Sequence, residues 1–203
     1  MIGTNRVVAG VALLAGIAIL VVLWRETPSG TVTDLPNLEG ELDWSGTTFD
    51  PVQSELYVRA SQALEEGDTK TSEALYREAI SKYPDDPDGY TSLGACLYMQ
   101  QRYEDAELEY ERALRLDPNS AFAYYGLGCV AFDRDRTSDA RSFLEKALAL
   151  NDEDGLSHRL LGMVYEELGN RSRAISHYGR AIKLLHSTGD VAFLKQRLAR
   201  LQQ

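Results

Sequence analysis

Residues that bind metals or act as nucleophiles are scarce in this sequence. Its 203 residues include three histidines and two cysteines. The histidines (His158, His177 and His186) do not stand near acidic clusters at the spacing of a metal or catalytic site. No glycine-rich phosphate loop follows a strand-like run. The sequence therefore predicts a protein that is not an enzyme and that holds no metal or cofactor.

Basic residues are also in the minority. Lys and Arg number 21 against 31 Asp and Glu, which gives a formal charge of −10. Because nucleic acids are bound through clustered Lys and Arg, this balance argues against a nucleic-acid partner. At 44% hydrophobic and 26% charged residues, the composition is otherwise ordinary for a globular protein.

Long apolar runs are absent except for residues 7–24, which contain no charged side chain. A helix of this length spans about 27 Å, which is just enough to cross a bilayer. Trp24 ends this run and Arg25 follows it, where interfacial residues are expected. We expect residues 1–24 to form an N-terminal tail and a transmembrane anchor. A cleaved signal peptide is the alternative, but no small-x-small cleavage pattern follows the run.

The charges that flank this run predict its orientation. Arg6 precedes it, whereas residues 25–52 carry one Arg and six acidic residues. Since positive flanks stay in the cytoplasm, we expect a cytoplasmic N-terminus and an exported main domain, periplasmic if the source is bacterial. Residues 25–52, interrupted by Pro and Gly, are predicted to be an acidic linker. Trp44 and Phe49 are unusual in a spacer and can dock on the following domain or on a partner.

From residue 53 onward the sequence repeats with a period of 34 residues, in the blocks 53–86, 87–120, 121–154 and 155–188. Small and large residues recur in phase along these blocks, such as Gly94, Gly128 and Gly162; Ala79, Ala113, Ala147 and Ala181; and Leu93, Leu127 and Leu161. Each block predicts two amphipathic helices that cross closely at the small residues. Residues 189–203 predict one more amphipathic helix that covers the last block, with Val191, Leu194, Leu198 and Leu201 on one face.

This pattern resembles the tetratricopeptide repeat (TPR) family. The second block carries the resemblance most fully, through Tyr90, Leu93, Gly94, Leu97, Tyr103, Ala106, Tyr110, Ala113 and Pro118. The resemblance implies an all-α fold: a right-handed solenoid of four helix-turn-helix repeats with a C-terminal capping helix, preceded here by the transmembrane helix.

In TPR proteins the first helix of each repeat lines a concave groove that binds other proteins. The resemblance therefore implies groove residues at Tyr57, Ser61, Leu64, Thr91, Tyr98, Phe122, Tyr125, Phe132, Arg159 and Met163, with Ala95, Cys129 and Glu166 at equivalent positions. These aromatic residues suit an apolar or aromatic segment. Some of them can instead pack against a neighbouring helix, or against the C-terminal helix folded into the groove.

Some relatives clamp a C-terminal carboxylate with Lys, Asn and Arg at set groove positions. Here those positions hold Tyr57, Ser61, Ser92, Phe122 and Gly126, so the clamp is not expected. Cys96 and Cys129 lie on the first helices of adjacent blocks; buried free thiols are expected, with a disulfide left open.

The sequence thus predicts a non-enzymatic, membrane-anchored adaptor or scaffold that binds other proteins and supports the assembly of a hetero-oligomeric membrane complex. Two alternatives stay open. The chain can be an integral structural subunit of a larger secretion, respiratory or photosynthetic complex. It can also be an accessory chaperone for exported clients.

Overall fold

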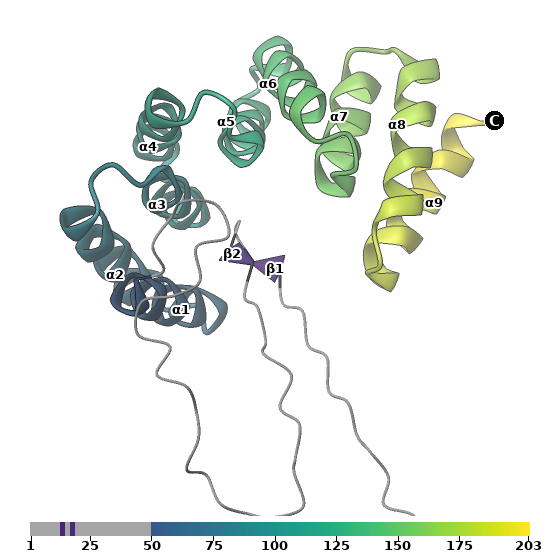
Figure 1. Ribbon diagram of the computed structural model, residues 1–203. Helices are drawn as coiled ribbons and strands as arrows, with labels where there is room; N and C mark the ends of the chain where they lie inside the picture. The colour runs from purple at the N-terminus through teal and green to yellow at the C-terminus, as the bar shows by residue number, and fades with distance from the viewer. Residues whose placement is uncertain (1–12, 15–16, 19–49) are drawn as a thin grey trace, which may run out of the picture.

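The computed structural model describes residues 13–14, 17–18 and 50–203. Between residues 50 and 203 it contains nine α-helices, namely α1 (Pro51–Glu65), α2 (Thr69–Lys82), α3 (Pro87–Met99), α4 (Tyr103–Leu116), α5 (Ala121–Asp133), α6 (Thr137–Leu150), α7 (Gly155–Glu167), α8 (Arg171–Leu184) and α9 (Thr188–Leu201). They pair in sequence order and form an arch, with α1, α3, α5 and α7 along its inner side (Figure 1). The all-helical solenoid of helix pairs that the resemblance implies is confirmed for residues 50–203.

The first helix of every repeat begins at a side-chain cap. Asp50, Asp86, Ser120 and Asp154 precede α1, α3, α5 and α7, and each accepts a hydrogen bond from a backbone N–H of the first helical turn. These caps satisfy donors that a helix start otherwise leaves free. Because the caps recur in step with the repeat, each helix pair starts at an equivalent point.

Small residues mark the helix crossings, as the repeat pattern predicts. Ala113, Ala147 and Ala181 are at most 2% exposed. Tyr110 of α4 lies against the glycines of two neighbouring helices. A methyl group added to Gly94 of α3 would stand 2.8 Å from its ring, and one added to Gly126 of α5 would stand 2.3 Å from it. The buried tyrosine therefore fits only because both positions lack a side chain.

Helix α9 covers the end of the solenoid. Leu194 is fully buried, and Leu198 and Leu201 pack beside it on the core of the last repeats. Carrying the 34-residue spacing one step further puts Lys195 and Gln196 at the positions of the buried Leu161 and Gly162, and both are exposed. A polar outer face is what ends a repeat array in water. The predicted capping helix is confirmed.

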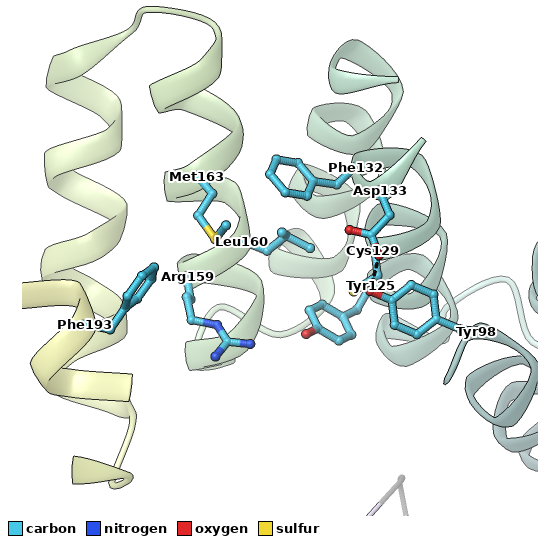
Figure 2. Close-up of a pocket in the computed structure, with 9 residues that line it drawn as sticks. All are labelled: Tyr98, Tyr125, Cys129, Phe132, Asp133, Arg159, Leu160, Met163 and Phe193. Atoms are coloured by element: carbon cyan, nitrogen blue, oxygen red, sulfur yellow. Dashed lines mark hydrogen bonds between the residues drawn. The ribbon is translucent and has the colours of Figure 1, made fainter. Parts of the chain in front are cut away.

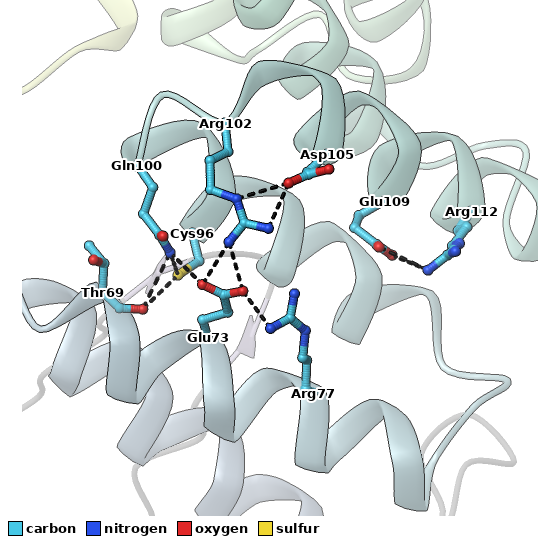
Figure 3. Close-up of polar contacts among 9 residues, drawn as sticks. All are labelled: Thr69, Glu73, Arg77, Cys96, Gln100, Arg102, Asp105, Glu109 and Arg112. Carbon is cyan, nitrogen blue, oxygen red and sulfur yellow. Dashed lines mark hydrogen bonds and ion pairs between the residues drawn. The ribbon is translucent and has the colours of Figure 1, made fainter.

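Ion pairs join the outer helices of the first three repeats. Glu73 of α2 accepts from Arg102, which precedes α4, at 2.9 Å (Figure 3). Glu107 of α4 accepts from Arg136 in the same way at 2.9 Å. Glu73 is 8% exposed and also receives a hydrogen bond from Gln100. Burial raises the pKa of its carboxyl group, but the hydrogen bonds from Gln100 and Arg102 outweigh burial, and the pKa is lowered.

We expect Glu73→Ala to destabilise the fold by about 1–3 kcal/mol, because it removes the buried carboxylate that accepts from Gln100 and from Nη1 of Arg102. Glu78→Ala on the same helix is the matched control, because its pair with Lys82 is exposed to water and contributes little to stability. Urea unfolding of both variants measures the difference. Equal losses would mean that Glu73 contributes no more than a surface pair.

His158 of α7 is a buried side chain whose ring packs against that of His177 of α8. It is 7% exposed, and its Nδ1 lies 2.9 Å from Nδ1 of His177. Its Nε2 is 3.1 Å from the Asp152 carbonyl oxygen. Since a carbonyl only accepts, Nε2 carries a hydrogen and Nδ1 is free to accept from His177. The two rings thus share one proton between their facing nitrogens.

Acid is expected to weaken the fold through this pair. Burial, together with the neighbouring His158, lowers the pKa of His177 from 6.5 to about 4. Between these values the unfolded chain binds a proton that the folded chain does not, so stability is full above the unfolded pKa and falls with pH. From pH 7 to 5 the loss through His177 alone is at most about 2 kcal/mol, because water reaches part of its ring. Thermal unfolding at pH 7 and pH 5 should show a smaller decrease in stability for His177→Gln than for the unaltered chain. An equal decrease would mean that His177 does not cause the loss of stability in acid.

Only four residues of the predicted transmembrane helix lie among the described ones. Leu13–Leu14 and Ile17–Ala18 form the short strands β1 and β2, which pair antiparallel, so the backbone there is extended and not helical. A short apolar run is compatible with either state, and periodicity alone does not separate them. No helix in the described ranges is long and apolar enough to cross a membrane. The predicted membrane-spanning helix is therefore not confirmed.

The other N-terminal predictions fall largely outside the described residues. Residues 1–12 and 25–49, which include Trp44 and Phe49, are not among the residues that the structure describes. Helix α1 begins at Pro51, ahead of the expected repeat start at residue 53.

Candidate functional site

The inner side of the arch has a hollow of about 290 Å³ between α5 and α7. Helices α3 and α9 complete its two ends (Figure 2). Its lining is mostly apolar and consists of Tyr98, Tyr125, Cys129, Phe132, Asp133, Arg159, Leu160, Met163 and Phe193. Because the helices that meet here belong to different repeats, the site exists only in the assembled solenoid.

One wall of the hollow comes from α3 and α5. The Tyr98 hydroxyl donates to Asp133 Oδ2 at 2.7 Å and so joins the two helices. Burial raises the pKa of the Cys129 thiol to about 12. This side chain therefore stays a neutral thiol and is not a nucleophile. Cys96 and Cys129 are both free thiols, as expected.

The opposite wall comes from α7 and α9. Arg159 of α7 donates to Asp190 of α9 at 2.6 Å, and Arg197 of α9 donates to Glu166 of α7 at 2.8 Å. These two ion pairs hold the capping helix beside the groove. Phe193, between them on α9, is 41% exposed, and the Arg197 guanidinium lies 5.2 Å from its ring centre.

The hollow brings together six of the thirteen predicted groove positions: Tyr98, Tyr125, Cys129, Phe132, Arg159 and Met163. The other seven (Tyr57, Ser61, Leu64, Thr91, Ala95, Phe122 and Glu166) do not line it. Phe122 is 48% exposed but lies outside the hollow, and Leu64 packs against the core of the first repeats.

Hydrogen bonds explain why the first repeats contribute little. Tyr57 is 4% exposed, and its hydroxyl donates to Asp86 at 2.6 Å, so it joins two repeats and does not face a ligand. Ser61 shares a hydrogen bond of 3.2 Å with the Tyr76 hydroxyl. The Thr91 hydroxyl donates to the Pro87 carbonyl at 3.0 Å. At these positions the expected open groove is replaced by internal contacts.

Three lining residues were not predicted from the sequence. Asp133 and Leu160 each directly follow a predicted position. Phe193 carries a signal that could have found it: the 34-residue spacing that relates Tyr125 to Arg159 leads next to Phe193. The capping helix thus occupies the place of the first helix of a fifth repeat, and it supplies a groove residue there.

The chemistry of this site favours binding over catalysis. The described residues contain no group of three or more His, Cys, Asp or Glu that could hold a metal ion. At the rim, Arg159 pairs with Asp190, and Asp133 accepts a hydrogen bond from the Tyr98 hydroxyl. The rest of the lining is formed by aromatic rings, Cys129, Leu160 and Met163. Such a surface suits apolar side chains of a polypeptide.

Comparison with known proteins identifies the family. The tetratricopeptide repeat model matches residues 57–121 and 125–185, so this chain belongs to the TPR family. TPR domains mediate protein–protein interactions, and the fold is typically a non-catalytic interaction module. No curated protein matches the chain.

Solved structures show the same fold at low identity. PilF of Pseudomonas aeruginosa superposes with a TM-score of 0.66 at 20% identity, over 74% of this chain and 67% of that one. MamA from Desulfovibrio magneticus RS-1 gives 0.59 at 20% identity, over 75% and 89%. The first TPR domain of Spaghetti (RPAP3), bound to the HSP90 peptide SRMEEVD, gives 0.54 at 17% identity, over 58% and 93%. These similarities establish the fold alone.

Proposed function

We propose that this TPR protein is a membrane-anchored adaptor whose concave hollow binds an apolar or aromatic segment of another protein. The observation that carries the proposal is the hollow itself. Phe132, Leu160, Met163 and Phe193 converge there from three helices. Aromatic and methionine side chains at such a place are typical anchors for a bound polypeptide.

The membrane part of the proposal is supported by the sequence. Residues 7–24 are uncharged and long enough to cross a bilayer as a helix. The acidic residues 25–49 then separate this run from α1. An adaptor tethered in this way raises the local concentration of its partner at the membrane and so supports the assembly of a complex there.

Site-specific photocrosslinking in the native membrane tests the proposal. A photoreactive benzoylphenylalanine replaces Phe132 in the hollow, and in a control chain it replaces Leu108, which is 53% exposed on the outer helix α4. We expect a discrete crosslinked protein from position 132 and not from 108. The same products from both positions, or none from 132, would overturn the proposal. A varied set of unfolded clients would favour the chaperone alternative. A partner lost only when residues 7–24 are replaced would favour the structural subunit.

The orientation of the anchor gives a separate prediction. Because Arg6 is expected to keep the N-terminus in the cytoplasm, a tag placed after Gln203 should be removed by protease added outside sealed right-side-out vesicles. A tag before Met1 should survive until detergent opens the vesicles. The reverse result on immunoblots would show that the TPR domain lies on the cytoplasmic side.

A further inference from the structure

The charge of the chain is distributed unevenly along the solenoid. Residues 171–203, which form α8 and α9, contain seven Lys and Arg against a single acidic residue, for a net charge of +6. Residues 53–170 contain 12 basic and 24 acidic residues, for a net charge of −12. The overall charge of −10 therefore conceals a basic C-terminal end that can attract an acidic segment.

This basic end borders the hollow. Phe193, Arg197 and Arg200 lie on successive turns of α9 and so share one face of the helix. Arg197 pairs with Glu166, whereas Arg200 is exposed and makes no ion pair within residues 50–203. An apolar hollow with a basic wall suits a segment that combines aromatic and acidic residues.

Residues 34–49 of this same chain have that composition. They read DLPNLEGELDWSGTTF, with acidic side chains at Asp34, Glu39, Glu41 and Asp43, a tryptophan at 44 and a phenylalanine at 49. The segment contains no Lys or Arg. It lies outside the described residues and ends directly at Asp50, the cap of α1.

The point where this segment joins α1 limits what its own chain can reach. Asp50 is held at the first repeat, because it accepts from the Val52 N–H and from the Tyr83 hydroxyl. Six residues from Trp44 to Asp50 span at most about 20 Å. The hollow lies two to three packed helices beyond α1, at about 8–10 Å for each helix. Phe49 therefore cannot enter the hollow of its own chain, and Trp44 is at the limit of its reach.

We infer that residues 34–49 of a second copy of this chain occupy the hollow, with Trp44 and Phe49 against its apolar walls and the acidic residues against α9. This inference rests on the proposed function, because it uses the same site. The chain therefore self-associates through the hollow. Because a partner protein needs the same hollow, self-association and partner binding exclude each other.

Mixed crosslinking between two full-length copies tests the inference. The first copy carries one tag and benzoylphenylalanine at Trp44; the second carries another tag and no photoreactive group. Irradiation in mild detergent should give a product with both tags, whose crosslinked peptide includes Phe132, Met163 or Phe193. Phe132→Ala with Phe193→Ala in the second copy should lower the yield about tenfold. Leu108→Ala with Leu150→Ala, at exposed outer positions, should leave the yield unchanged.

A second set of variants tests the acidic residues of the segment. Glu39→Gln, Glu41→Gln and Asp43→Asn in the first copy should lower the two-tag yield several-fold at low salt, and about 0.5 M salt should do the same to the unaltered chain. Equal two-tag yields from the altered and the unaltered first copy at low salt would overturn the contact between the acidic residues and α9.

The remaining outcomes separate this inference from the proposed function. A crosslink from position 44 to the hollow, found in material that carries the first tag alone and has the mass of one chain, would show docking within the chain. That result would overturn the second-copy assignment. Crosslinks outside the hollow, or no two-tag product, would overturn the inference as a whole. If position 132 still captures a different protein in the membrane, the proposed function stands without it.

Discussion

Gly126→Ala is expected to destabilise the TPR domain by about 3 kcal/mol, at the upper end of what overpacking costs. A Cβ at this position would stand 2.3 Å and 2.4 Å from two ring carbons of Tyr110. The ring cannot move away easily, because it is 4% exposed and Gly94 confines it from α3. Against a total stability of about 5–15 kcal/mol, this loss should lower the melting temperature by about 6–12 °C.

Gly179→Ala is the matched control for this prediction. Gly179 also lies inside a helix, α8, but nothing stands within 4 Å of the Cβ that alanine would add. Since alanine is the better helix former, this variant should gain about 0.5–1 kcal/mol. Thermal unfolding of both variants should therefore give shifts of opposite sign. Shifts of the same sign would show that α5 does not approach α4 as closely as described.

Removing the two phenylalanines of the hollow should reduce partner affinity by more than about 100-fold. Phe132 and Phe193 come from opposite walls, on α5 and α9. Truncating an anchor residue costs about 2 kcal/mol or more, which is about thirtyfold in affinity for each. Titration of the partner captured at position 132 against the Phe132→Ala, Phe193→Ala chain measures this loss. The loss should persist at high salt, because apolar contact is not screened.

The control for this prediction changes exposed apolar residues on the outer helices. Leu108 on α4 and Leu150 on α6 are 53% and 42% exposed. Their replacement by alanine should leave affinity within about threefold, since isolated surface residues contribute little. Melting curves of both pairs confirm that each chain is folded. If the outer pair weakened binding as strongly, the partner site would lie on the outer side of the arch.

The repeat architecture was predictable because it depends on local and periodic signals. Helix pairs, small residues at crossings such as Gly128, and the apolar face of α9 around Leu194 all recur at fixed spacing. The resemblance to the TPR family predicted that Tyr125, Phe132 and Met163 lie on the inner side of the arch. The repeat spacing also contained the position of Phe193, although this requires the last helix to be counted as part of a fifth repeat.

The N-terminal part of the chain was less accessible to the same reasoning. The uncharged run 7–24 indicates a membrane helix by its length and hydropathy, which describe a whole segment and not the backbone of each residue. Leu13–Leu14 and Ile17–Ala18 are extended in the structure. The transmembrane prediction stays a prediction that the protease experiment can decide.

The sequence by itself determined that this chain is a TPR solenoid, because a 34-residue pattern of small and large side chains repeats from one helix pair to the next. Only the tertiary structure decided which part of the inner side is open. Tyr57 is closed off by its hydrogen bond to Asp86, and Arg159 is tied to Asp190. Contacts of this kind join residues about one repeat apart, and they depend on how neighbouring repeats stack, which the spacing of residues within a repeat does not encode.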